Sequence, residues 1–477
     1  MNQPLKGLSS GEIIEWIENY LLTHQAHQFT INGVTYPFVR ELHFAAVPYP
    51  LQRKYSMLAG LFITRPGDLL FLFQSDPQFD IDINSRRGLR GVYRIVSQPF
   101  ADSHSITCST GYEILGKCPY CGTFHSDLSG KCLKCDNDYP PFATPLNSYY
   151  HLLVMNLRLD IEPLIVFERA VSDERTYADM SDPGIIWIGR HDNAMGPGKG
   201  SSIRQLLREE AVKLVRLFLT EPDQKISFPK KVPYPYSHGV IINEDGTPAS
   251  WLEVQPRPIA GDIVTHELML NFHISTTIDQ PGSGIQTALQ PFLTSQDLEY
   301  FSNEFPWGYT AGTSDFVCSL AKQGIRYRLI VMEFKKDWVG DETVIQTSLY
   351  VPWVVQTLTQ FANPSPRELE VVPVFVGRRL DPDACRPKPY GYRASFNSGV
   401  KLDVQVQSPI YIEYKPVRIQ KVNSKHYASD LEYLNKSTLL ANREILWQPP
   451  KGTVTSQVEK DWVKQTSWVL ARRQAGL

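Results

Sequence analysis

The chain has 477 residues, of which 42% are hydrophobic and 21% are charged, with a formal net charge of −2. This is an ordinary globular composition, and the length exceeds what one core usually organises, so we expect two or three domains. The small net charge excludes nucleic-acid binding through a global positive field and leaves it to local basic patches. The sequence lacks an apolar run of the roughly 20 residues that a transmembrane helix needs, so we expect no membrane segment.

The first element is a predicted amphipathic helix within residues 1–30. Ser9 and Glu12 have the spacing of a capping box, in which each side chain bonds the other's backbone amide. A signal peptide would begin with a basic and then a strongly apolar segment, and this start has neither. We therefore expect a cytoplasmic protein.

The next region, residues 31–220, is predicted to be rich in short strands with few helices between them. A small β-barrel or a strongly bent sheet is the expected fold. The strand candidates are bounded by turn residues and are 65–74, 89–100, 162–171 and 183–189. An amphipathic helix is expected to follow within residues 201–219.

Four of the seven cysteines form two CxxC pairs, Cys118 with Cys121 and Cys132 with Cys135. Two such pairs converge on tetrahedral Zn²⁺, and four thiolates leave no open position for water, so the expected site is structural. Residues 116–137 are then a zinc ribbon. Lysines in this ribbon are an alternative source of nucleic-acid contacts.

Proline-rich stretches at 227–239 and 253–262 predict a linker, placed at 221–260. The following region, 261–400, has the pattern of an α/β core. It contains a helix candidate at 261–274, a hairpin, a second helix and the strand 369–377. A C-terminal extension, 401–477, is expected to hold one strand near 409–419 and a final helix. Trp462 and Trp468 on that helix are candidate contacts of a homodimer.

A predicted hairpin at 313–336 contains the candidate catalytic residues. The turn-prone tetrapeptide AKQG separates two β-rich runs. Asp315 comes early on the first strand, while Glu333 and Lys335 come late on the second. Alternate strand residues share a face, so Glu333 and Lys335 point the same way and Asp315 lies beside them.

Two neighbouring carboxylates repel unless a cation lies between them. Mg²⁺ is the expected ion, with Mn²⁺ as a substitute, because it takes oxygen ligands and keeps several waters. Asp315 and Glu333 are the predicted ligands. Lys335 is predicted to stabilise charge on a phosphate or to lower the pKa of a bound water.

The spacing of Asp315 from Glu333-Phe334-Lys335 resembles the signature of the PD-(D/E)XK nuclease superfamily. The next segment, VIQTSLYVPWV, resembles the helix that follows this strand in NucS/EndoMS-like nucleases. That resemblance, over roughly residues 261–380, implies that Gln346 and Tyr350 line the site. It implies a restriction-endonuclease-like core and Mg²⁺-dependent cleavage of DNA.

The sequence departs from this pattern in two places. Ser314 replaces the proline before the first acid, and Pro352 is expected to kink or end the second helix. The family often has an upstream helical glutamate, for which Glu267 is the candidate and Glu299 the rival.

The segments at 65–74 and 88–102 resemble the PUA-like fold, in its EVE and ASCH branches, with the zinc ribbon as an insertion. Such a domain implies binding of a flipped or modified base. Tyr93, Trp187 and Phe71 are the aromatic candidates, with a core role as the alternative. The basic residues that we expect to contact phosphates are Arg86, Arg87, Arg90, Arg94 and Lys336.

The sequence therefore predicts an α+β multidomain protein that acts as a Mg²⁺-dependent DNA endonuclease, with modification-dependent restriction or defence as the expected role. A mismatch or structure-specific repair nuclease is one alternative. A non-catalytic nucleic-acid-binding protein on a nuclease scaffold is another, and RNA is not excluded as the substrate.

Overall fold

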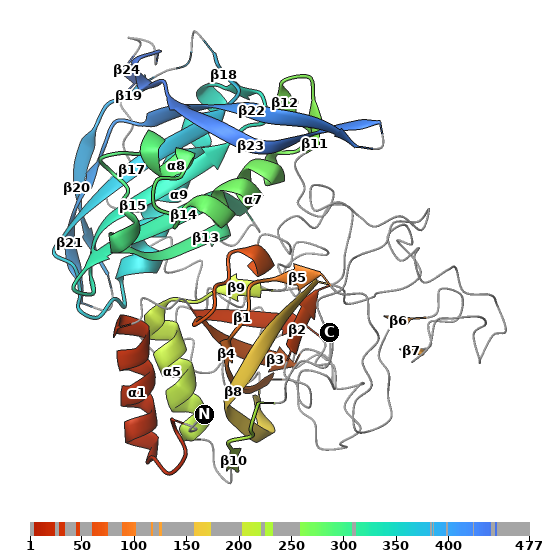
Figure 1. Cartoon of the computed structure of the whole chain (residues 1–477). Helices are drawn as coiled ribbons and strands as arrows, with labels where there is room; N and C mark the ends of the chain where they lie inside the picture. The colour runs from red at the N-terminus through yellow and green to blue at the C-terminus, as the bar shows by residue number, and fades with distance from the viewer. Residues whose placement is uncertain are drawn as a thin grey trace, which may run out of the picture. The chain divides into compact units, whose positions relative to one another are not determined.

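The chain is an α+β protein with mixed β-sheets, seen in a computed structural model (Figure 1). It divides into two compact units. Unit 1 comprises Met1–Asp173, Ser201–Arg204 and Leu214–Pro256; unit 2 comprises Glu174–Gly200, Gln205–Lys213 and Arg257–Leu477. The structure describes residues 4–23, 28–33, 44–47, 60–74, 88–101, 116–117, 124–125, 157–172, 203–220, 225–231, 258–307, 312–381, 384, 386–396, 399–422, 424–439 and 444–445.

Unit 1 is built on a mixed sheet in the order β10-β8-β4-β3-β1-β9, with β2 and β5 also pairing β8. The predicted strands at 65–74, 89–100 and 162–171 are confirmed as β3, β4 with β5, and β8. The elements are α1 (Ser10–Thr23), β1 (Gln28–Gly33), β2 (Phe44–Val47), β3 (Leu69–Gln74), β4 (Gly88–Ile95), β5 (Phe100–Ala101), β6 (Gly116–Lys117), β7 (Phe124–His125), β8 (Leu157–Ser172), β9 (Ile203–Gln205) and β10 (Ile226–Ser227).

The capping box of the first helix is confirmed. The Ser9 backbone amide donates to Glu12 Oε2 at 2.7 Å, and the Glu12 amide donates to Ser9 Oγ at 3.4 Å. The apolar stripe of α1 is buried at Ile13, Ile17 and Leu21. Among the helices in the described ranges, none is long and apolar enough to cross a membrane.

The helix expected over 201–219 begins later than predicted. Residues 203–205 form strand β9, and helix α5 spans Arg208–Leu219. The Glu210 carboxylate accepts a hydrogen bond from the Leu207 amide at 2.8 Å, which caps the helix at this point. Strand pairing, a tertiary interaction, outweighs the helical spacing of the preceding residues.

Unit 2 is built on a sheet in the order β12-β11-β23-β22-β17-β15-β14-β13, with β21 pairing β17 and β20 pairing β21. Its elements are β11 (Pro258–Ala260), β12 (Ile263–Val264), α7 (Glu267–Thr277), α8 (Gly284–Ala288), η4 (Ser295–Asp297), β13 (Leu298–Trp307), β14 (Gly312–Lys322), β15 (Ile325–Phe334), β16 (Trp338–Val339), α9 (Asp341–Thr359), β17 (Glu368–Gly377), β18 (Arg379–Leu380), β19 (Arg386–Pro387), β20 (Tyr390–Ser395), β21 (Lys401–Val406), β22 (Ile410–Val422), β23 (Lys425–Asn435), η5 (Ser437–Leu439) and β24 (Glu444–Ile445).

The order of these elements agrees with the sequence prediction of helix, hairpin, helix and strand. The first helix, α7, starts at Glu267 because the short hairpin β11–β12 takes the residues before it. The described part of the expected C-terminal extension adds β21, β22 and β23 to this same sheet. The predicted final helix lies outside the described residues.

The predicted hairpin at 313–336 is confirmed as β14 and β15, which pair antiparallel from Phe316–Met332 to Lys322–Ile325. Gln323 and Gly324 form the turn, and both have positive φ, 52° and 78°. A two-residue turn with positive φ at both positions matches the twist of the strands. The AKQG sequence thus sets the pairs next to the turn, and a β-bulge between Leu320 and Ala321 then shifts the register by one residue.

Helix α9 runs through Pro352, so the expectation that this proline ends the helix is wrong. Proline removes one helical hydrogen bond, at a cost of roughly 3 kcal/mol. Val351, Val354 and Val355 flank it and are buried in the cluster that packs α9 on the sheet. Burying such side chains contributes roughly 1.5–3 kcal/mol each, which outweighs the loss.

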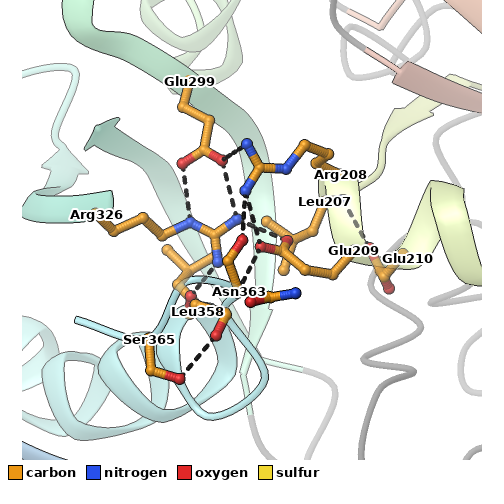
Figure 2. A network of polar contacts seen from close by, with 10 residues as sticks. Leu207, Arg208, Glu209, Glu210, Glu299, Arg326, Leu358, Asn363 and Ser365 are labelled. Atoms are coloured by element: carbon orange, nitrogen blue, oxygen red, sulfur yellow. Dashed lines mark hydrogen bonds and ion pairs between the residues drawn. The ribbon is translucent and has the colours of Figure 1, made fainter. Parts of the chain in front are cut away.

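A buried ion cluster surrounds Arg326, the second residue of β15 (Figure 2). Its side chain is 1% exposed and bridges Glu299 at 2.9 Å and Glu209 at 2.7 Å. It also donates to the Leu358 carbonyl at the end of α9. Arg208 donates to the Asn363 carbonyl at 2.8 Å. The cluster therefore ties the segment 205–213 to the sheet and to α9.

The pKa of Glu209 is lowered in this cluster. Burial alone would raise it, but the charges of Arg326 and Arg208, with the Arg326 hydrogen bond, outweigh burial. A carboxyl group with a lowered folded pKa stabilises the fold above its ordinary pKa of about 4.3. That stabilisation is lost as the pH falls through the lower folded value.

We predict that Glu209→Gln lowers the free energy of unfolding by roughly 2–3 kcal/mol at neutral pH, because it leaves Arg326 with one fewer counter-charge. The difference from wild type should shrink as the pH falls below about 4. Urea unfolding of both proteins across acidic to neutral pH measures it. The exposed Glu368→Gln is the control and should show no such trend. A pH-independent difference would contradict the assignment.

Candidate active site

The register of β14 and β15 brings Asp315 and Glu333 together. Phe316 pairs with Met332, so the next positions on the two antiparallel strands are Asp315 and Glu333. The Phe334 amide donates to Asp315 Oδ2 at 2.7 Å, which holds the Asp315 carboxylate against the end of β15. The sequence prediction that these two acids lie side by side is confirmed in this geometry.

Glu333 is the most buried acid of the site, at 1% exposure. Lys335 Nζ donates to Glu333 Oε1 at 2.9 Å, so the two side chains share one face as strand alternation predicts. Within the described part of the chain, Glu333 Oε2 is buried and has no hydrogen-bond partner. A buried carboxylate oxygen without a partner costs about 1–3 kcal/mol or more, which marks this position as one that needs a ligand.

The pKa values of Asp315, Glu333 and Lys335 are all raised. Burial raises the pKa of Asp315 well above its ordinary value, and the charge of Glu333 raises it further, against the Phe334 amide and Lys335. Burial also raises the pKa of Glu333, although Lys335 opposes it. Burial would lower the pKa of Lys335, but Glu333, Asp315 and Glu267 outweigh it and the net shift is upward. The site thus gathers acids whose mutual repulsion is only partly relieved by one ammonium group.

Glu267, the upstream candidate, lies near this group. It is the first residue of α7, and its Oε1 accepts a hydrogen bond from the Lys336 amide at 3.3 Å. Its charge contributes to the raised pKa of both Asp315 and Glu333. The rival, Glu299, instead pairs with Arg326 near the turn end of the hairpin. The location of the two residues therefore favours Glu267 over Glu299 as the upstream glutamate of the site.

Gln346 and Tyr350 lie one turn apart on α9, and Gln346 Nε2 donates to the Tyr350 hydroxyl. The Tyr350 ring is 3% exposed and packs in the cluster that includes Val331 of β15. Val331 and Glu333 alternate onto the same face of the strand, so α9 covers the face that bears the acids. Lys336, a predicted phosphate contact, is exposed beside them.

Two residues that the sequence did not reveal hold the site in place. Asn271 Nδ2 of α7 donates to the Asp315 carbonyl at 2.9 Å. The Tyr414 hydroxyl donates to the Lys336 carbonyl and accepts from the Val264 amide at 3.2 Å. A polar asparagine inside the apolar run LMLNFHI was a usable signal for the first. Nothing local points to Tyr414, because its contact depends on strand order.

The glycine that ends β17 also shapes the site. A Cβ on Gly377 would lie 2.6 Å from Val339 Cγ2, 3.3 Å from the Asp337 carbonyl and 3.5 Å from the Lys335 carbonyl. Val339 is fully buried and cannot move aside freely. Only glycine lets β17 approach the segment that follows Lys335 this closely.

The residues present fit a hard divalent cation. Asp315 and Glu333 supply oxygen donors, and the partnerless Glu333 Oε2 offers an open lone pair. The described residues contain no group of three or more His, Cys, Asp or Glu side chains arranged for a metal. Mg²⁺ commonly binds through one or two carboxylates and completes its shell with water, so two acids suffice.

Unit 1 gives less support to its predicted nucleic-acid contacts. Tyr93 and Phe71 are fully buried, and Arg90 is 2% exposed, which favours core roles for all three. Arg94 pairs with Glu162. Several candidates lie outside the described residues and stay predictions: Arg86, Arg87, Trp187 and the zinc ligands Cys118, Cys121, Cys132 and Cys135.

A scan against protein-family models and searches of curated proteins and of solved structures found no match to this chain. The interpretation of the site therefore depends on its geometry and on the sequence pattern.

We predict that Asp315→Asn raises the melting temperature of the metal-free protein at neutral pH. The raised pKa of Asp315 means that its ionised form is unfavourable in the fold, and the neutral amide relieves the repulsion while still accepting from Phe334. Excess Mn²⁺ should stabilise wild type by roughly 2–3 kcal/mol, or several degrees. It should leave Asp315→Asn unchanged.

Differential scanning calorimetry with EDTA or Mn²⁺ measures both effects. Asp403→Asn, an exposed aspartate paired with Arg393, is the matched control and should keep the wild-type response to Mn²⁺. An equal Mn²⁺ response in Asp315→Asn would place metal binding elsewhere.

Proposed function

We propose that the chain is a metal-dependent DNA endonuclease whose cutting site is formed by Asp315, Glu333 and Lys335. Unit 2 is then a restriction-endonuclease-like core of the PD-(D/E)XK type. The observation that carries the proposal is the pair of neighbouring acids next to an ammonium group, with one buried carboxylate oxygen left without a hydrogen-bond partner.

Each residue has a role that its position supports. Asp315 and Glu333 would hold Mg²⁺ or Mn²⁺, which when bound supplies Lewis-acid chemistry and an activated water. Lys335 presents its ammonium group beside Glu333, where it can stabilise negative charge on a scissile phosphate. Gln346 and Tyr350 help to position these groups from α9, and Glu267 adds a third carboxylate at the site's edge.

Unit 1 is proposed as a PUA-like domain that selects the substrate, with the zinc ribbon of residues 116–137 inserted in it. A domain that recognises bases, joined to a domain that cuts, is suited to modification-dependent restriction or another defence role. The order of β3 after the Gly67–Asp68 turn, followed by β4, agrees with the resemblance.

We predict that the protein nicks supercoiled plasmid DNA in the presence of Mg²⁺ or Mn²⁺. Glu333→Ala and Lys335→Ala should each lower the cleavage rate by about 10²-fold or more, because the first removes a metal ligand and the second removes a positive charge beside the scissile phosphate. Gel quantification of nicked and linear plasmid over time gives the rates.

Two control variants separate chemistry from folding. Glu368→Gln and Lys322→Ala change an exposed acid and an exposed lysine at the other end of the strands and should cut at the wild-type rate. Equal cleavage by wild type, Glu333→Ala and Lys335→Ala would remove the catalytic assignment. Metal-independent DNA binding without any cleavage would leave a binding protein on a nuclease scaffold.

A further inference from the structure

The strands β22 and β23 continue as a long ribbon, drawn in blue in Figure 1, which β11 joins at His426 and Tyr427 and whose tip extends past the neighbouring strands of unit 2. We propose that the outer part of this ribbon, residues 418–422 and 424–428, is an arm that binds duplex DNA and holds the substrate of the candidate active site. The proposal deepens, and rests on, the nuclease function proposed above.

The outer part of the ribbon has positive charge only. Its charged residues are Arg418, Lys421 and Lys425, while Asp430 and Glu432 lie nearer the base, where they pair with Val417 and Lys415. The three basic side chains are exposed, as is His426, which pairs with Lys421 across the strands. In a chain whose net charge is −2, this is a local basic surface of the kind that binds phosphates.

The ribbon begins at the same end of the sheet as the acids. Glu333 pairs with Phe375 of β17, and Phe375 pairs with Tyr411 of β22, so these three residues are level across the sheet. Pairing of β22 with β17 ends at Glu413, and β22 continues to Val422. Those nine further residues span about 30 Å at roughly 3.3 Å per residue. The ribbon therefore projects from the edge where Glu333 and Lys335 lie.

Direct contacts join the base of the ribbon to the site. The Tyr414 hydroxyl donates to the carbonyl of Lys336, one residue after Lys335. Glu413 pairs with Arg378 at 2.7 Å, and the Arg378 amide donates to the Asp337 carbonyl at 3.0 Å. The direction of the arm is thus fixed relative to the candidate metal ligands.

The length of the ribbon fits duplex DNA, because about 30 Å corresponds to roughly nine base pairs. Strand β11 pairs with β23 at Tyr427 and His426, so the exposed face and the tip of the ribbon are the parts that can contact the backbone of a duplex. A duplex with its scissile phosphate at Lys335 would have the next turn of its backbone within reach of Lys421 and Lys425. Exposed Ile419, at 51%, lies on the same arm and offers an apolar contact to the duplex.

The test is binding of a fluorescent 30-base-pair DNA duplex to the full chain in EDTA, followed by anisotropy at several salt concentrations. Lys421→Ala with Lys425→Ala is the test variant. Its affinity should fall roughly 10- to 60-fold near 0.1 M salt, and the slope of log K against log salt should be less steep by about 1.8. Lys421→Arg with Lys425→Arg should bind like wild type.

Lys322→Ala with Lys401→Ala is the control of equal charge. Lys322 ends β14 and Lys401 begins β21, both at the opposite end of the sheet, and both are exposed. This variant should bind within about twofold of wild type. Both alanine variants should melt near wild type, because exposed substitutions usually change stability by less than about 0.5 kcal/mol.

Unchanged affinity and slope in the ribbon variant would overturn the proposal. Equal weakening in the control variant would overturn it too, as would a failure of the wild-type protein to bind the duplex. Ribbon-dependent binding of duplex RNA but not of DNA would also overturn it. Because EDTA removes cleavage from the assay, ribbon-dependent binding without plasmid nicking would reject only the nuclease. Nicking that depends on Glu333 but not on the ribbon would reject only the arm.

Discussion

The antiparallel register of β14 and β15 is the constraint on which the candidate site depends. It places Asp315 directly beside Glu333 at the end of a strand that is buried on both faces. One residue of slippage would turn Glu333 to the opposite face of the sheet from Asp315 and so separate the two acids. The two-residue turn at Gln323 and Gly324 sets the first pairs of the hairpin, and a β-bulge between Leu320 and Ala321 shifts the register by one residue to the one that the acids have. The Asn271 and Phe334 contacts fix the backbone and carboxylate of Asp315.

The buried charge at one end of β15 is fully paired, whereas the buried charge at the other end is only partly paired. Near the turn, Arg326 is surrounded by two carboxylates and a carbonyl, so its charge is compensated and it joins α9 to the sheet (Figure 2). At the far end, Glu333 has one ammonium partner and one partnerless oxygen. Such an arrangement costs stability in the free protein. Groups of this kind are typical of sites that bind a ligand rather than of sites that only support the fold.

Local patterns predicted the parts of the fold that local physics decides. The capping box at Ser9, the AKQG turn and the alternation of Glu333 with Lys335 follow from a few neighbouring residues, and the structure has all three. Packing decided the features that were missed. Helix α9 continues through Pro352 because its flanking valines are buried, and residues 203–205 pair as a strand before α5 begins.

Site residues on distant strands could not be predicted from the sequence, because packing and strand order decide their contacts. Tyr414 contacts Lys336 only because β22 lies beside β17 in the sheet, and no short segment of the sequence predicts strand order. The ribbon was visible in the sequence only as one strand near 409–419. Its alignment with the acids emerged from the pairings of β15, β17 and β22.

The most direct measurement of the central claim is anomalous scattering at the manganese edge from crystals grown with saturating Mn²⁺. The account predicts a peak between Asp315 and Glu333, with carboxylate oxygens at roughly 2.0–2.3 Å from the ion. No peak at this position, or a peak only elsewhere in the chain, would contradict the account.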